Sequence, residues 1–201
     1  MTAFAVAADG KTAYVGGGGS NNTNNGMVYM IDIQEHKMLK EYWINETCTN
    51  GSNSTYEPVI SPVNGDVFIG NKDSRVYCFD KDLNGIKWSY AHLEGTNNAF
   101  NYSHPCVDAD GNFMISAGQE SPATYIFSPT GAILKKYVYA KDKDSTRSMA
   151  GNNYLNGILY TLGYGASGHD GYFIAKYVGG NNPTGSWVRS GGDLCGSNCI
   201  K

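Results

Sequence analysis

The chain has 201 residues, of which 41% are hydrophobic and 12% aromatic, and this composition excludes an intrinsically disordered protein. Only 16% of the residues are charged, the formal net charge is −3, and the only local basic cluster, Lys135-Lys136 followed by Lys141 and Lys143, is better explained as a solvated strand end and loop than as a nucleic-acid site. No apolar run approaches the roughly 18 residues of a membrane-spanning helix, and the segment MTAFAVAADG lacks the regions of a signal peptide.

A turn motif recurs along the chain. Asp-Gly or Asn-Gly pairs stand at 9–10, 64–65, 110–111 and 156–157, at intervals of 55, 46 and 46 residues. Both pairs suit the positive φ angles of tight hairpins, and each lies between two apolar segments. The motif therefore predicts four β-hairpins at a nearly constant period.

The strands predicted around these turns form four similar groups. In chain order they are 4–9, 12–18, 28–33 and 37–44; then 57–63, 66–71, 76–81 and 86–92; then 104–110, 112–118, 124–129 and 133–140; then 149–155, 158–165, 172–177 and 186–189. The segment 34–42 is the only helical candidate, and it falls where a turn and a strand are expected.

Four-stranded units that repeat every 40 to 50 residues or so are typical of β-propeller blades. We therefore predict an all-β fold of four antiparallel blades at about 4–44, 57–92, 104–140 and 147–189, followed by a tail rich in Gly, Ser and Cys at 190–201. Neighbouring blades stack face to face, because one small sheet cannot bury both of its faces alone.

The stretch VYCFDKDLNGIKWSY carries a resemblance to a known family. Its strand, Asn-Gly turn and Trp-containing strand resemble the PQQ-like (quinoprotein-type) propeller repeat, and the matching residues are Val76, Tyr77, Asp80, Asn84, Gly85 and Trp88. The third repeat keeps Thr130-Gly131 and the fourth keeps Thr184-Gly185, whereas the first has His36-Lys37 at the turn. The resemblance implies that Trp43, Trp88, Tyr137 and Trp187 pack between blades.

PQQ-like propellers include quinone-dependent dehydrogenases as well as noncatalytic assembly proteins. Many of the enzymes hold the quinone near a calcium ion and a disulfide between adjacent cysteines, and this chain has no adjacent Cys pair. No catalytic, cofactor-binding or metal-binding residue is therefore carried over. We expect a noncatalytic module that binds protein or glycan partners without a cofactor; the alternative is part of a dehydrogenase with PQQ and calcium.

Other candidate sites have simpler explanations in a turn-rich β protein. The segment 108–112, DADGN, resembles the start of a calcium loop, but it also reads as a hairpin turn that enters a strand at once. His36, His92, His104 and His169 are scattered without a paired Ser or Cys and acid at readable spacing. The glycine run at 16–19 lacks the Lys-Ser/Thr pair and the helix of a phosphate-binding loop.

Two features favour a secreted or cell-surface protein. Acceptor sequences for N-glycosylation occur at Asn21, Asn45, Asn50, Asn53 and Asn101. Cys195 and Cys199 bracket a short polar turn and are candidates for a local disulfide, with metal binding as the alternative. Cys48, Cys78 and Cys106 are expected to be buried or paired thiols.

Propellers of the PQQ-like family usually close with seven or eight blades, so four blades are expected to form an open arc. The outer faces of its first and last blades then have to be covered. Further blades of the same chain, another copy, or closure into a small ring could each cover them.

Overall fold

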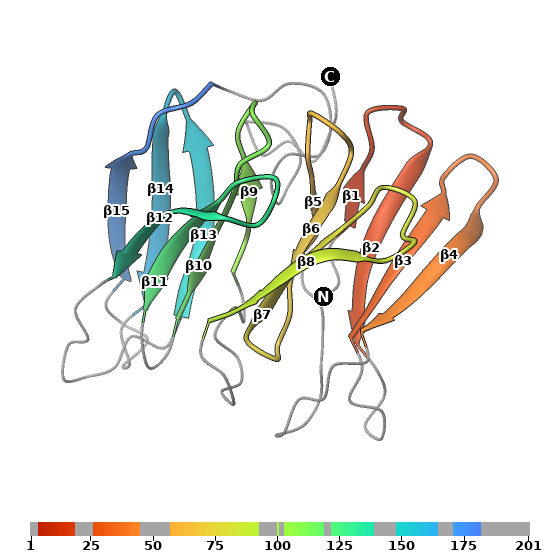
Figure 1. Cartoon of the computed structure of the whole chain (residues 1–201), viewed down its shortest axis with the longest axis horizontal. Helices are drawn as coiled ribbons and strands as arrows, with labels where there is room; N and C mark the ends of the chain where they lie inside the picture. Colours follow the sequence, from red (N-terminus) through yellow and green to blue (C-terminus); the bar gives the residue numbers. More distant parts are fainter. Residues whose placement is uncertain are drawn as a thin grey trace.

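A computed structural model describes residues 4–18, 26–44, 57–92, 100, 103–118, 122–138, 148–164 and 171–181. The helix and strand assignments in these ranges consist of β-strands alone. The strands form four antiparallel sheets, which we call blades one to four (Figure 1). The all-β propeller-blade fold predicted from the repeat is confirmed. The segment 34–42 contains a turn and a strand, as the repeat predicts.

Within each blade the strands follow one another in sequence order. Blade one holds β1 (Phe4–Val6), β2 (Thr12–Gly18), β3 (Gly26–Asp32) and β4 (Lys37–Ile44), and blade two holds β5 (Val59–Ile60), β6 (Val67–Gly70), β7 (Arg75–Phe79) and β8 (Ile86–Ala91). Blade three holds β9 (Cys106–Val107), β10 (Phe113–Ala117), β11 (Ala123–Phe127) and β12 (Ile133–Val138). Blade four holds β13 (Ser148–Leu155), β14 (Ile158–Tyr164) and β15 (Gly171–Tyr177), while the strand predicted at 186–189 and the tail at 190–201 lie outside the described residues.

The glycine of each predicted turn has a positive φ. The angles are 67° at Gly10, 78° at Gly65, 79° at Gly111 and 77° at Gly157. A side chain at these positions would be strained in this left-handed backbone conformation, which explains why glycine recurs there. In Figure 1 these turns lie along the upper edge of the blades, which we call the turn edge.

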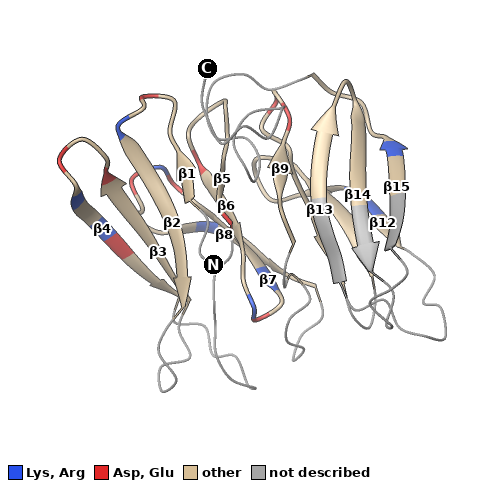
Figure 2. Cartoon of the chain, turned by 180° about the vertical axis from the view of Figure 1, so that it is seen from behind, with Lys and Arg blue, Asp and Glu red and all other residues tan. Residues whose placement is uncertain are grey.

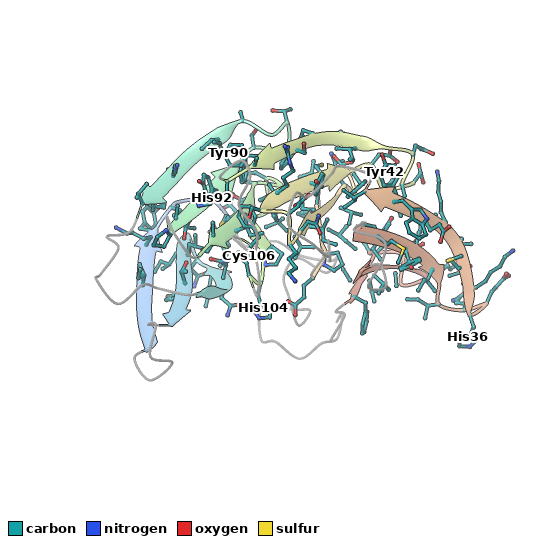
Figure 3. All side chains as sticks on the ribbon, turned by 90° about the horizontal axis from the view of Figure 1, so that it is seen from below. His36, Tyr42, Tyr90, His92, His104 and Cys106 are labelled. Atoms are coloured by element: carbon teal, nitrogen blue, oxygen red, sulfur yellow. The ribbon has the colours of Figure 1, made fainter. Side chains whose placement is uncertain are left out.

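The core lies between the blades. Alternate residues of one strand face opposite junctions: Val67 and Ile69 of β6 face blade one, while Phe68 faces blade three. Because blades two and three are covered on both faces, β6, β10 and β11 are buried along their whole length. The fourth strands β4, β8 and β12 are more exposed and follow the convex side of the arc in Figure 3.

Candidate interaction site at the blade junctions

The fourth strands carry a clamp that joins each blade to the next. Lys40, Trp88 and Lys135 occupy the same place in their blades, each beside a β-bulge between the third and fourth strands. Each donates a hydrogen bond to a backbone carbonyl of the following blade: Lys40 Nζ to Asp82 O at 3.1 Å, Trp88 Nε1 to Pro129 O at 2.9 Å, and Lys135 Nζ to Val178 O at 2.8 Å. Each of the three successive junctions is therefore tied by one N–H donor at this position.

A tyrosine two residues further along completes the clamp. The ring of Tyr42 contacts Phe79 edge-on, with ring centroids 5.1 Å apart, and Tyr90 lies 5.3 Å from Phe127. Tyr137 packs against the core that blade three shares with blade four. The clamp is visible in the sequence as LKEY, KWSY and LKKY, a Lys/Trp-x-Tyr pattern in which Trp88 aligns with Lys40 and Lys135, and Tyr137 aligns with Tyr42 and Tyr90.

Each of these tyrosines packs against the following blade. It contacts the face that the following blade turns toward the preceding one, and we call this face the receiving face. Tyr29, Tyr77 and Tyr125 occupy one register position on this face, opposite Val15, Ile69 and Ile115 respectively. In blades two and three both members of the pair are 0% exposed. In blade one Val15 and Tyr29 are only half-buried, because no described blade covers them.

The four aromatic residues assigned to blade packing have different surroundings. Trp88 lies between blades two and three, with ring centroids 5.8 Å from Phe68 and 5.5 Å from Phe127. Tyr137 lies between blades three and four, with Lys176 Nζ 5.4 Å from its ring. Trp43 is 41% exposed, on the receiving face of blade one beside Met27, and Trp187 lies outside the described residues.

The junction between blades three and four contains a buried polar network. Asn152 is its centre: its Oδ1 accepts hydrogen bonds from Ser116 Oγ at 2.6 Å and Thr161 Oγ1 at 3.1 Å, and its Nδ2 donates to the carbonyl of His104 at 3.0 Å. Thr124 Oγ1 lies 2.7 Å from Ser116 Oγ. Such a network is favourable only when every member is satisfied, so it aligns these two blades specifically.

The segment predicted as either a calcium loop or a turn is a hairpin turn. Asp108 Oδ1 accepts hydrogen bonds from the backbone N–H groups of Asp110 and Asn112, and Oδ2 accepts one from Asn112 Nδ2. Burial raises the pKa of Asp108, although the hydrogen bonds from Asn112 oppose this shift. Among the described residues, no group of three His, Cys, Asp or Glu side chains is placed to hold a metal ion.

The histidines and cysteines of the described ranges do not converge on one site. His36 lies in the β3–β4 turn, His92 Nδ1 lies 2.7 Å from the Tyr125 hydroxyl, and His104 pairs with Glu57 (Figure 3). Cys78 and Cys106 are both buried, and burial raises the pKa of Cys78, which disfavours the nucleophilic thiolate. The residues outside the described ranges are His169, Cys48, Cys195, Cys199, Asn21, Asn45, Asn50, Asn53 and Asn101.

Charge is distributed in small groups of both signs. Figure 2 shows acidic and basic residues side by side on the turns of blades one and two and along β4.

Within the described ranges, no helix is long and apolar enough to cross a membrane. Gly16 to Gly18 of the glycine run belong to β2, where the ring of Tyr29 lies over Gly17.

Solved structures similar to this chain share its fold. No protein-family model and no curated protein matches the chain. BamB from Moraxella catarrhalis matches with a TM-score of 0.54 and 12% identity, over 84% of this chain and 50% of BamB, so the chain spans about half of that protein. The Dos1 propeller matches with a TM-score of 0.59 and 11% identity, over 90% of this chain and 42% of that one. Raptor from Chaetomium thermophilum matches with a TM-score of 0.60 and 9% identity, over 87% and 15% of the two chains.

Identities this low show the fold alone. The propeller architecture is therefore established for this chain, and the likeness of its repeat to the PQQ-like family stays a resemblance.

Proposed function

We propose that this chain is a noncatalytic, extracellular propeller module that acts in assembly or recognition. The observation that carries the proposal is the receiving face of blade one, which has the register and apolar character of the covered faces but is not covered by any described blade. Phe4 and Trp43 on this face are 49% and 41% exposed. Burial of apolar surface stabilises by roughly 25 cal/mol per Å², so a face of this kind favours association.

The cover that fits this face is the fourth-strand clamp of another propeller blade. At all three junctions between described blades, the clamp packs a Tyr ring against the buried side chains of the receiving face. It also places an N–H donor against the segment that follows the third strand of the receiving blade. A blade from the same chain or from another copy supplies such a clamp and extends the arc. The remaining ring surface is then available to protein or glycan partners.

Native mass measurement tests the assembly. Where another copy supplies the clamp, we expect the 21.7 kDa chain to form a larger particle, and we expect Val15→Glu to reduce the mass of that particle by placing a charge in the contact. Leu134→Glu is the matched control, because Leu134 is 52% exposed on β12. The proposal would be overturned if the wild type were a monomer and bound a hydrophobic dye to the same extent as Val15→Glu.

Two further measurements test the remaining parts. Adding PQQ and calcium should produce no dye-linked oxidation of alcohols or sugars, and turnover would establish the quinoprotein alternative. In an oxidising compartment, mass spectrometry should find a Cys195–Cys199 bridge and, in a host that glycosylates, glycan on at least one of Asn45, Asn50, Asn53 and Asn101. Bare Asn and five free thiols in protein from its natural source would contradict secretion.

A further inference from the structure

The arc ends in two faces that no described blade covers. The receiving face of blade one lies at one end, and the face of blade four that points away from blade three, which we call the outer face, lies at the other (Figure 1). Both faces carry large apolar side chains that are exposed in the single chain. Ile33 on blade one is 37% exposed, and Leu155 and Tyr177 on blade four are 41% and 78% exposed.

A row of three apolar residues crosses the outer face of blade four at the turn edge. Leu155 pairs with Ile158 across β13 and β14, and Ile158 pairs with Tyr177 across β14 and β15. Residues that pair directly across antiparallel strands lie on the same face of a sheet. Tyr154 and Leu159, which alternate with this row, pack against blade three, so the row faces away from blade three.

The same row is small or polar in the other three blades. Its members there are Ala7, Thr12 and Asp32 in blade one, Ser61, Asp66 and Asp80 in blade two, and Asp108, Asn112 and Ser128 in blade three. Large apolar residues take these positions only in the blade whose outer face no described blade covers. An exposed apolar row of this kind marks a contact surface.

The interior junctions show what the first member of this row meets in the following blade. A Cβ added to Gly111 would lie 2.9 Å from Ser61 Oγ and 3.4 Å from Pro129 Cγ, so Ser61 of blade two lies beside the Gly111–Pro129 pair on the receiving face of blade three. The equivalent residues of the other two junctions line one cavity each, Ala7 with Lys81 and Asp108 with Val178.

The residue that takes the place of Pro129 on blade one is Ile33. Its backbone N–H donates a 2.7 Å hydrogen bond to the Lys11 carbonyl, just as the N–H of Val178 donates a 2.8 Å hydrogen bond to the Gly157 carbonyl. A blade four that precedes blade one in the register of the interior junctions therefore brings Leu155 to Ile33. Both of these residues are large and apolar, whereas each interior pair contains a small or polar residue.

We infer that the outer face of blade four covers the receiving face of blade one in a second copy of this chain, head to tail. The inference rests on the proposed function, because it names the partner of the receiving face of blade one. One kind of contact then covers both open faces and continues the register of the interior blade junctions. Since the contact joins two different surfaces, each copy contributes one of each.

One substitution on each face tests the contact. Leu155→Glu and Ile33→Lys should each raise the dissociation constant of the particle at least about tenfold in native mass measurements, because each places an unpaired charge in an apolar contact. An equimolar mixture of the two variants, one of them labelled with heavy nitrogen, should restore mixed particles. In such particles an unchanged contact alternates with one in which Glu faces Lys. Val138→Glu, at a 64% exposed position of β12, is the control and should leave the mass unchanged.

The outcomes separate this inference from the proposed function. Dissociation by Ile33→Lys but not by Leu155→Glu would overturn the head-to-tail contact, while the proposed cover of blade one would stand. A mixture that associates no better than its components would also overturn the contact. A wild-type monomer would overturn it too, and dye binding would then decide the proposed function. If Leu155→Glu fails to fold, Tyr177→Glu replaces it, because Tyr177 is 78% exposed.

Discussion

Trp88 and Trp43 show how much the surroundings of one residue type can differ along the repeat. Trp88 packs on rings from two blades and satisfies its indole N–H with the Pro129 carbonyl. Trp43 follows Tyr42 in β4 and therefore lies on the opposite face of blade one, which no described blade covers. Burial and a paired N–H make a tryptophan structural, and neither property can be read from the residue type.

Trp88→Ala should lower the free energy of unfolding by about 3–5 kcal/mol, because it leaves a cavity and an unpaired carbonyl in the central junction. Trp88→Phe should cost less, since it keeps part of the packing. In the isolated chain Trp43→Ala should change the free energy of unfolding by less than about 1 kcal/mol. Urea unfolding measures all three, and equal losses for Trp88→Ala and Trp43→Ala would contradict this assignment.

His104 should make stability depend on pH. Its hydrogen bond to Glu57 raises the pKa of the imidazole, against burial, which lowers it. The stabilisation is fully present below the pKa of about 6.5 that His has in an unfolded chain, and it is lost as pH rises through the higher folded pKa. The His104 side chain is 42% exposed, so screening by solvent keeps the effect small.

The melting temperature should therefore fall between pH 6 and pH 8 more steeply in the wild type than in His104→Gln. Glu57→Gln should flatten the profile in the same way, because it removes the other member of the pair. If both variants keep the wild-type slope, the pair does not contribute.

At the scale of elements, the three junctions share one arrangement of strands but differ in whether apolar or polar side chains fill them. The first two are apolar and aromatic, whereas the receiving face of blade four presents Asn152, Thr161 and Lys176 to blade three. The polar side chains of blade three, Ser116 and Thr124, are placed to match them. Such a match specifies which blade follows which, since a mismatched neighbour would leave buried polar groups without partners.

Asn152→Ala should destabilise the third junction more than its lost contacts alone would suggest. Removing the amide leaves the hydroxyls of Ser116 and Thr161 buried with fewer partners, and each such group costs about 1–3 kcal/mol. Asn153→Ala is the control at the adjacent exposed position. Urea unfolding should separate the two variants clearly, and similar midpoints would show that water satisfies the network.

At the scale of the whole molecule, stability should be highest in the middle of the arc. Blades two and three are covered on both faces, whereas blades one and four are each covered on one face by described residues. In a stacked array of this kind, stability is close to a sum of blade and junction contributions.

Hydrogen exchange should follow this gradient. The amides of β6, β7, β10 and β11 should exchange last, and those of β4 and β15 first, because exchange of the end blades needs only one junction to open. Mass spectrometry of peptides that cover these strands provides the measurement. The gradient applies to the monomeric Val15→Glu variant, in which exchange at β4 or β15 as slow as at β7 would contradict it.

The sequence by itself determined the fold class, because turn glycines at a constant period and strands of alternating residues are local properties that each repeat carries in full. The repeated Tyr at the clamp was also present in the sequence, although its importance appeared only when register placed Tyr42, Tyr90 and Tyr137 at one position. Tertiary structure alone decided which face of each blade is covered, since a one-residue shift of register exchanges the two faces of a strand. It also decided that Trp88 packs over Gly131 at the second junction, whereas the buried side chain of Leu83 fills the first, because such contacts depend on how the side chains of neighbouring blades meet in space.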